Sequence, residues 1–310
     1  LATSKQQEYA RELVKRLADK LDAKLVEGLL DPDETTEAGI AEQRERIEKL
    51  KTALPKIDAA EGRDLLQLAD MLSRKSIWII GGDGWAYDIG YGGVDHVLAS
   101  GYDVNILVLD TEVYSNTGGQ TSKATPRGAV AKFSAGGKAC GKKDLALLAM
   151  EYENVYVAHI AYAAKDIQTL RAFHEAEAHK GPSLIIAYSP CIAHGVDMSN
   201  NHRQQEMAVK SGHWPLFRFD PRRIEEGKNP LHLDSAAPSM PYEDFIKSET
   251  RFNMLWRSHP DDAERFLKQA QKEVQHRYQY YKQLSELAWN EETKASAVKM
   301  TTKISKQLEN

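Results

Sequence analysis

The chain has 310 residues, of which 42% are hydrophobic and 28% are charged, and its formal net charge is −4. This length accommodates one large α/β domain with additions or two modest domains. The composition is ordinary for a globular protein, and the acidic balance argues against a dedicated nucleic-acid binder, which usually carries a basic excess. No apolar run approaches the roughly 18 residues that a membrane helix needs.

The first residues show an amphipathic helical pattern. The opening LATSKQQEYARELVKRL lacks the continuous apolar core and the cleavage site of a signal peptide. Because residue 1 is Leu rather than Met, we expect the chain to begin partway through a longer polypeptide or after processing. Its two cysteines, Cys140 and Cys191, are too few for a secreted disulfide scaffold and favour a cytoplasmic location.

Residues 1–73 are predicted to form a helical lead-in segment. A break at Asp31-Pro32-Asp33 separates the first helical pattern from a second one at about 37–54, and a third follows at about 62–72. We interpret the many Glu, Lys and Arg residues of this segment as solvated helix faces.

Residues 74–198 are predicted to form an α/β core, because apolar β-rich runs alternate with helical patterns. Such alternation is typical of a mostly parallel sheet with helices on both faces. Ligands of these sheets bind at the carboxyl ends of the strands. The predicted strands are 75–80, 103–109, 154–160 and 183–188, and the predicted helices are 89–100, 144–151 and 166–179.

Residues 199–310 complete the predicted organisation. The part at 199–242 is rich in Pro, Arg, His and Asn, and we expect extended chain that wraps a surface. Helical patterns return from about Asp244 to the end of the chain, the longest at 264–287.

The strongest chemical signal is a pair of loops at two predicted strand ends. Gly82-Asp83-Gly84 follows the first strand, and after 26 further residues the segment TEVYSN begins at Thr111. Mg²⁺ prefers six oxygen ligands, commonly one or two from protein and the rest from phosphate and water. Asp83 offers a carboxylate, Thr111 a hydroxyl and Val113 a carbonyl, while the glycines let the backbone approach a diphosphate.

Two other interpretations of the GDG triplet remain open on the residues alone. It could be a plain glycine-rich turn between a strand and a helix. It could also begin a dinucleotide-binding fingerprint, in which Asp110 at the end of the second strand would bind a ribose. The third glycine of that fingerprint is Tyr87 here, which argues against a dinucleotide.

The two loops resemble the diphosphate motif of thiamine-diphosphate enzymes. Most of those enzymes have Asn where this chain has Thr111, which argues against a decarboxylase or a transketolase. The segments GGDGWAYDIGYGGVDHVLASG and LDTEVYSNTGGQTSKATPRGAVAKF, with YSPCIAHG and GHWPLF further along, are similar to the pyruvate:ferredoxin (flavodoxin) oxidoreductases, where Thr is expected at this place. The resemblance spans nearly the whole chain, most specifically at about 75–220, and points to the C-terminal portion of such an enzyme.

The resemblance implies a set of site residues. Asp83, Thr111 and the carbonyl of Val113 would bind Mg²⁺, and Asn116 would reach the thiazolium and the 2-oxoacid, where its amide could stabilise developing negative charge. The residues expected to line the diphosphate are Gly82, Asp83, Gly84, Trp85, Thr111, Glu112, Val113, Tyr114, Ser115 and Asn116. Asn116 could instead be an ordinary turn residue.

The resemblance also implies a partial iron–sulfur site. A lone cysteine is usually a small buried hydrophobe, but Cys191 resembles one ligand of a 4Fe–4S cluster whose other three ligands would lie outside this chain. Cys140 has no such match, and we interpret it as structural or as an exposed thiol.

The remaining polar residues carry weaker signals. We interpret His194 and His202 as polar loop histidines, since the ten histidines show no metal-binding spacing. A basic loop near the proposed site is expected to be solvated, or else to place an anionic substrate or contact another domain. Its members are Lys123, Arg127, Lys132 and Lys138.

The implied activity is oxidative decarboxylation of pyruvate to acetyl-CoA and CO₂, with electrons passed through iron–sulfur clusters to ferredoxin or flavodoxin. The glutamate that activates the cofactor, and much of the pyruvate pocket, would come from other domains, so the chain is not expected to be catalytic by itself. A homodimer is implied. Two alternatives remain, namely a portion of another 2-oxoacid:ferredoxin oxidoreductase and a non-catalytic thiamine-diphosphate-binding module.

Overall fold

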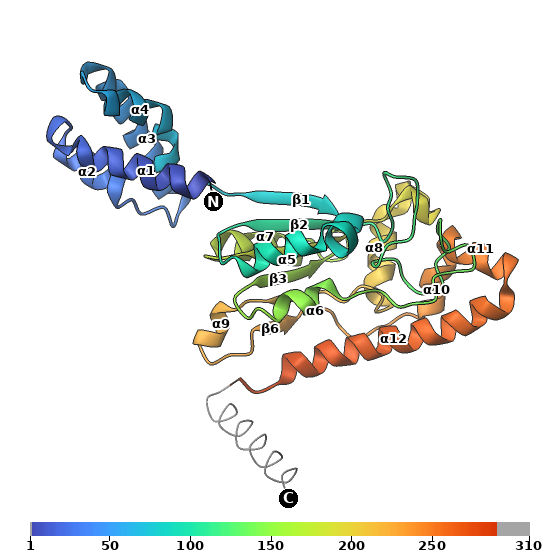
Figure 1. Cartoon of the computed structure of the whole chain (residues 1–310). Coiled ribbons are helices and arrows are strands. Elements are labelled where there is room, and N and C mark those ends of the chain that lie inside the picture. The colour runs from blue at the N-terminus through green and yellow to red at the C-terminus, as the bar shows by residue number, and fades with distance from the viewer. Residues whose placement is uncertain (1, 290–310) are drawn as a thin grey trace, which may run out of the picture. The chain divides into compact units, whose positions relative to one another are not determined.

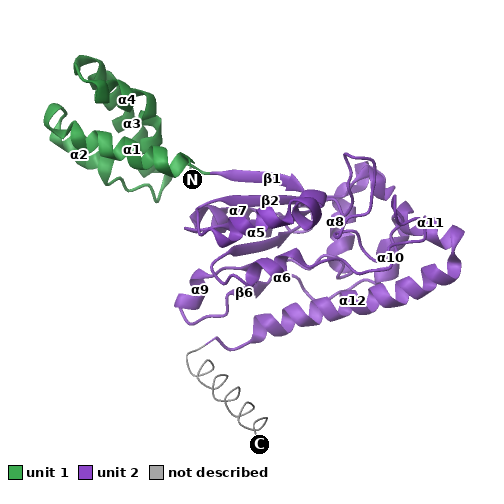
Figure 2. Ribbon diagram, viewed as in Figure 1, with its two compact units in different colours: residues 1–76 green, residues 77–310 purple. Residues whose placement is uncertain are grey.

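The computed structural model describes residues 2–289, which form two compact units divided between Ser76 and Ile77 (Figure 2). None of the helices in this described part is long and apolar enough to cross a membrane. The predicted helical pattern beyond residue 289 lies outside the described residues.

The first unit is helical, as the sequence predicted. Its helices are α1 (Ala2–Arg16), α2 (Ala23–Leu30), α3 (Glu37–Ala53) and α4 (Ala60–Leu68), with 3-10 turns at Ala18–Lys20, Leu54–Lys56 and Ala69–Leu72. The pattern predicted as one opening helix is interrupted at Leu17–Asp22, and Asp22 caps α2 by accepting a hydrogen bond from the Leu25 N–H at 2.9 Å. These helices enclose a core of their own, in which Leu13, Leu50 and Leu65 are fully buried.

The second unit is built on a six-stranded sheet with the order β1-β2-β4-β3-β5-β6 (Figure 1). The first four of these strands are parallel, which confirms the predicted mostly parallel sheet. β5 and β6 add two short antiparallel strands at the β3 edge. The strands are β1 (Trp78–Gly82), β2 (Asn105–Asp110), β3 (Tyr156–Ile160), β4 (Ser183–Tyr188), β5 (Phe217–Phe219) and β6 (Leu231–Leu233).

Helices cover both faces of the sheet. α5 (Tyr91–Ala99), α6 (Leu145–Met150) and α12 (Pro260–Glu286) pack on one face, and α7 (Asp166–Ala178) packs on the other (Figure 1). A short π-helix at Gly84–Ile89 joins β1 to α5. The remaining helices are α8 (Asn201–Lys210), α9 (Arg222–Glu225), α10 (Tyr242–Lys247) and α11 (Thr250–Ser258), with 3-10 turns at Ile192–His194 and Met198–Asn200.

The prediction of extended wrapping chain at 199–242 was wrong in part. This segment contains α8 and α9, and it supplies the two strands that extend the sheet. β5 and β6 have three residues each, too few for a periodic pattern to stand out, and the sheet edge of β3 provides their hydrogen-bond partners. The predicted long C-terminal helix is confirmed as α12.

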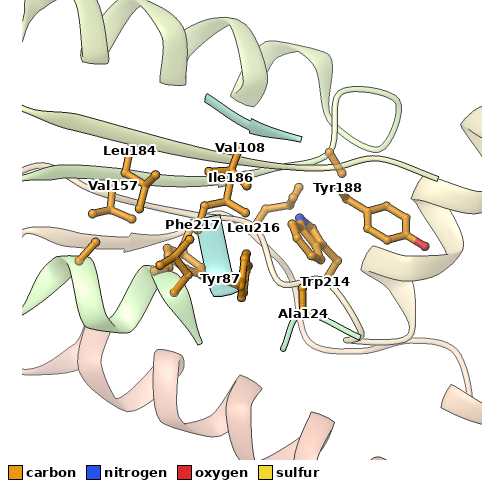
Figure 3. Close-up of a cluster of buried hydrophobic side chains, with 14 of the residues drawn as sticks. Tyr87, Val108, Ala124, Val157, Leu184, Ile186, Tyr188, Trp214, Leu216 and Phe217 are labelled. Atoms are coloured by element: carbon orange, nitrogen blue, oxygen red, sulfur yellow. The ribbon is translucent and has the colours of Figure 1, made fainter. Parts of the chain in front are cut away.

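The main core fills the space between the sheet and the helices on the α5 side. Trp214, Tyr87 and Phe217 are almost completely buried there, beside Val108 and Ile186 from the sheet (Figure 3). Full burial of a large apolar side chain contributes about 1.5–3 kcal/mol each. The core thus packs Tyr87, from the segment after β1, against Trp214 and Phe217, which lie more than a hundred positions later in the chain. The predicted site residues follow the carboxyl ends of β1, β2 and β4.

Candidate functional site

The two predicted loops meet at the carboxyl edge of the sheet. β1 and β2 are adjacent parallel strands, with Gly82 in register with Leu109. Asp83 directly follows β1 and Thr111 directly follows β2, so the parallel register brings the two residues together.

The oxygens of the predicted magnesium ligands converge on one another. Thr111 Oγ1 lies 2.8 Å from Asp83 Oδ1 and 2.9 Å from the Val113 carbonyl oxygen. Ser115 Oγ lies 3.2 Å from Thr111 Oγ1, and Ser122 Oγ donates to Asp83 Oδ2 at 2.6 Å. We call these five residues the Asp83 cluster.

The Asp83 cluster has more acceptor lone pairs than protons. The Thr111 hydroxyl has a single proton, which can serve either Asp83 or the Val113 carbonyl but not both. Asp83 is only 1% exposed, and its carboxylate accepts from the neutral hydroxyl groups of Thr111 and Ser122. A cation placed among these hard oxygens would satisfy the unmatched lone pairs, so the residues fit Mg²⁺.

The electrostatics of Asp83 lead to the same conclusion. Burial, followed by the nearby charge of Asp110, raises the pKa of Asp83 to about 6. Its carboxylate is therefore held in an environment that disfavours the isolated negative charge. No group of three or more His, Cys, Asp and Glu side chains with metal-binding geometry occurs in the described part of the chain.

Glycines beside Asp83 make room for aromatic rings. A Cβ atom added to Gly84 would lie 2.4 Å from the Tyr114 ring, and the Tyr114 hydroxyl donates to the Gly84 carbonyl at 3.1 Å. One added to Gly81 would lie 2.4 Å from the Trp85 ring. Gly82, in contrast, is exposed and has space around it, which leaves the strand end open to a ligand.

Ser115 and Asn116 lie on an exposed turn of the second loop. The turn is closed by the Gly119 N–H, which donates to the Tyr114 carbonyl at 2.8 Å, and by the Tyr114 N–H, which donates to Gln120 at 2.9 Å. The structure thus places the Asn116 side chain at the surface beside the Asp83 cluster's loop, and its predicted contact with thiazolium and substrate stays a prediction.

Glu112 differs from its neighbours, because its side chain is completely buried in ion pairs. Its carboxylate accepts from Arg251 Nη2 at 2.6 Å, from His213 Nε2 at 2.9 Å and from Lys142 Nζ at 3.1 Å. Its backbone N–H donates to Asp110, and its carbonyl accepts from Thr125. The predicted contact of Glu112 with the diphosphate therefore finds no support in the structure.

These buried charges form a set that the sequence analysis missed. Asp110, Glu112, Lys142, His213, Glu249 and Arg251 are joined by contacts of 2.6–3.1 Å, and we call them the Glu112 network. Burial alone would raise the pKa of Glu112, but Lys142, His213 and Arg251 hold that pKa well below its ordinary value. Glu112 has a φ of 57°, an unusual backbone conformation for a non-glycine residue.

The dinucleotide alternative is contradicted by the same geometry. Asp110 is fully buried, where it accepts from the Tyr87 hydroxyl at 2.7 Å and from Lys142 Nζ at 2.7 Å. It cannot reach a ribose, because its oxygens are occupied inside the protein. Tyr87, which stands at the third glycine position, is part of that arrangement.

The segment after β4 places Cys191 beside the same edge of the sheet. Cys191 is half-buried, and its sulfur accepts from the Ala193 N–H at 3.4 Å. Three residues later His194 is fully buried, with Nε2 lying 2.5 Å from the Thr111 carbonyl oxygen. The interpretation of His194 as a polar loop histidine was wrong, since the packing of α11 against this loop covers it.

The other weak signals separate into exposed and structural residues. His202 is exposed, but it lies on α8 and not in a loop, so that part of its interpretation was wrong. Cys140 is an exposed thiol, one of the two alternatives given for it. Lys123 and Lys132 are also exposed, whereas Arg127 binds Glu273, and Lys138 donates to the Thr125 carbonyl at 2.5 Å. Burial lowers the pKa of Lys138 to about 8. In the basic loop, Arg127 and Lys138 therefore make contacts within the protein, while Lys123 and Lys132 are exposed to solvent.

The chain is similar in sequence to known proteins. Residues 59–187 match the family model described as "Thiamine pyrophosphate enzyme, C-terminal TPP binding domain". The chain is 55% identical to the pyruvate-flavodoxin oxidoreductase of Trichormus variabilis and 50% identical to that of Rhodospirillum rubrum, over 92% and 94% of its length. It is 53% identical over 78% of its length to the pyruvate:ferredoxin oxidoreductase of Moorella thermoacetica.

These matches cover only part of each relative, namely 24% of the two pyruvate-flavodoxin oxidoreductases and 21% of the Moorella enzyme. A solved 2-oxoglutarate:ferredoxin oxidoreductase from Magnetococcus marinus matches 37% of this chain and 40% of its own at 25% identity, with a TM-score of 0.34 that is too low to bear on the fold.

Proposed function

We propose a function from the correspondence of this chain with the thiamine-diphosphate-binding portion of the pyruvate-flavodoxin and pyruvate:ferredoxin oxidoreductases. In this proposal the chain binds the diphosphate of thiamine diphosphate through Mg²⁺ and contributes to the oxidative decarboxylation of pyruvate to acetyl-CoA. The single observation that carries it is the Asp83 cluster at the edge of the sheet. The Thr111 hydroxyl has one proton and lies within hydrogen-bond distance of two acceptors, the Asp83 carboxylate and the Val113 carbonyl.

The chain's own residues would have distinct parts. Asp83, the Thr111 hydroxyl and the Val113 carbonyl would ligate Mg²⁺, which in turn would neutralise the diphosphate. Gly82 and Gly84 would let the diphosphate approach the backbone, with Trp85, Tyr114 and Ser115 beside it. Asn116 would donate its amide to the oxygen of the 2-oxoacid that gains negative charge.

Bound thiamine diphosphate would supply the carbon nucleophile that adds to the keto group and would retain the electrons when CO₂ leaves. Cys191 would provide one of the four thiolates of a 4Fe–4S cluster, and the remaining three would come from the part of the enzyme that this chain does not cover. The proposed partners are therefore the remaining domains, coenzyme A and a ferredoxin or flavodoxin, and the proposed assembly is a homodimer.

Calorimetric titration of the full 310-residue chain with thiamine diphosphate and Mg²⁺ tests the proposal. We expect Mg²⁺-dependent binding that falls at least about a hundredfold in Asp83→Ala, because a charged ligand of a hard cation is lost. Asp95→Ala is the matched control, since Asp95 lies on α5 and accepts from the Tyr152 hydroxyl away from the cluster.

Binding that is unaffected by Asp83→Ala would contradict the metal assignment. If the isolated chain does not bind, the same pair of variants in the full-length enzyme decides the matter. Retention of bound thiamine diphosphate in full-length Asp83→Ala would then contradict the proposal.

A further inference from the structure

The short turn that carries Cys191 is closed by its own hydrogen bonds. Residues Ile192–His194 form a 3-10 turn that begins at Cys191, and the His194 N–H donates to the Cys191 carbonyl at 2.9 Å. The Cys191 sulfur accepts from the Ala193 N–H within the same turn. These hydrogen bonds link Cys191 to Ala193 and His194 within one turn.

This turn is fastened to the rest of the protein on two sides. On one side His194 Nε2 lies 2.5 Å from the Thr111 carbonyl oxygen. On the other side the Thr250 hydroxyl donates to the Gly195 carbonyl at 2.8 Å. Gly195 has a φ of 71°, and a Cβ atom added there would lie 2.3 Å from the Thr250 side chain, so the turn sits tightly against α11.

The hydrogen bond from His194 to Thr111 has a defined direction. A carbonyl oxygen only accepts, so Nε2 carries the proton and donates it. The other ring nitrogen, Nδ1, has no hydrogen-bond partner among the described residues, and the nearest carboxylate oxygen, on Glu249, lies 3.8 Å away. The ring is fully buried, so water does not replace the Thr111 contact if that contact is lost.

We propose that His194 is a positioning residue that fixes the Cys191 turn against the Thr111 loop. One buried hydrogen bond thus joins the turn that carries Cys191, the predicted cluster ligand, to the loop that carries Thr111, a predicted Mg²⁺ ligand. This inference rests on the proposed function, in which His194 would hold the proposed cluster ligand Cys191 and the proposed Mg²⁺-binding loop at one spacing.

Hydrogen–deuterium exchange of the full chain without cofactor tests the proposal. We expect His194→Leu to speed amide exchange about tenfold in both 109–117 and 189–196, because a buried hydrogen bond that joins them is lost. Thr250→Val, which removes the tie on the opposite side, is expected to speed exchange only in 189–196. His202→Leu changes an exposed histidine nearby and should alter neither segment.

A second readout follows the cysteine itself. In a Cys140→Ser background, alkylation of Cys191 by iodoacetamide should be about tenfold faster in His194→Leu and in Thr250→Val. His194→Gln, whose side-chain amide can donate to the Thr111 carbonyl, should restore slow exchange in 109–117. A residue that merely fills space would not be rescued by this polar substitution.

Faster exchange in 189–196 alone, or in neither segment, would overturn the proposal for His194→Leu. If that variant does not fold, His194→Asn decides by the same criterion, since its shorter amide keeps a polar group but does not reach Thr111. None of these readouts uses thiamine diphosphate. Retention of bound thiamine diphosphate in full-length Asp83→Ala would therefore contradict the proposed function and leave the hydrogen bond between the two loops untouched.

Discussion

The Asp83 cluster and the Glu112 network both include residues at the carboxyl end of β2, and they differ in how their buried charges are paired. In the Glu112 network each buried carboxylate meets a cation, with contacts of 2.6–3.1 Å. In the Asp83 cluster the buried carboxylate accepts hydrogen bonds from the neutral hydroxyl groups of Thr111 and Ser122. A buried carboxylate that forms an ion pair with a side chain of the protein supports the fold. A buried carboxylate that faces other oxygen atoms can instead bind a cation from solution.

The difference also explains why the Glu112 side chain is buried, although Glu112 was predicted to line the diphosphate with its neighbours. Asp83 and Thr111 point into a cluster that a ligand can complete, while the neighbouring Glu112 turns inward with a positive φ. That inward turn joins the second loop to α11 through Arg251. The Glu112 network therefore supports the geometry of the loop that presents Thr111 and Val113.

Removal of Arg251 is expected to have the largest effect on this comparison. Arg251→Leu would leave Glu112 and Glu249 buried without their shared cation, which should lower the free energy of unfolding by about 3–5 kcal/mol. Chemical denaturation measures this loss. Arg265→Leu, which removes an exposed pair with Asp262, should cost no more than about 1 kcal/mol. Equal small effects for both variants would show that the network is not structural.

A methyl group at Gly84 should have an intermediate effect. Gly84→Ala would place a Cβ atom 2.4 Å from the Tyr114 ring, and the forced displacement should lower the free energy of unfolding by about 1–3 kcal/mol. Gly92→Ala is the matched control, because it lies on α5 with nothing within 4 Å. Alanine there should stabilise the helix by up to about 1 kcal/mol. Thermal denaturation of both variants should show shifts of opposite sign.

The pH dependence of Asp83 should give the smallest and most specific effect. Its folded pKa of about 6 lies above the ordinary value of an aspartate, so the unfolded chain ionises first. Without metal, the stability contributed at low pH is lost as the pH rises from about 4 to about 6, by no more than about 1.4 kcal/mol per pH unit.

The difference in unfolding free energy between the wild type and Asp83→Asn isolates this group. We expect that difference to fall across the window and to level off above pH 6. Saturating Mg²⁺ with thiamine diphosphate should remove the loss, because the cation stabilises the ionised carboxylate. A difference that is independent of pH would show that Asp83 is not held in a desolvated environment.

Local patterns of the sequence determined the four parallel strands, most of the helices and the alternation of strands and helices along the α/β core. Apolar runs such as 77–80 and 106–109 predict strands, and glycines at a strand end mark a loop. Parallel strands share one carboxyl edge, so the spacing of Asp83 and Thr111 was enough to predict that they meet. The structure brings Asp83, Thr111 and Val113 together as that argument requires.

The tertiary structure alone decided which polar side chains turn inward. Lys142, His213 and Arg251 are separated from Glu112 by 30, 101 and 139 positions, and no local pattern connects residues so far apart. The same holds for His194, 83 positions from Thr111, and for β5, whose three residues become a strand because β3 offers an edge. The burial of a side chain and its hydrogen-bond partners depend on how the whole chain packs, whereas the periodicity of a strand depends on residues that are adjacent in the sequence.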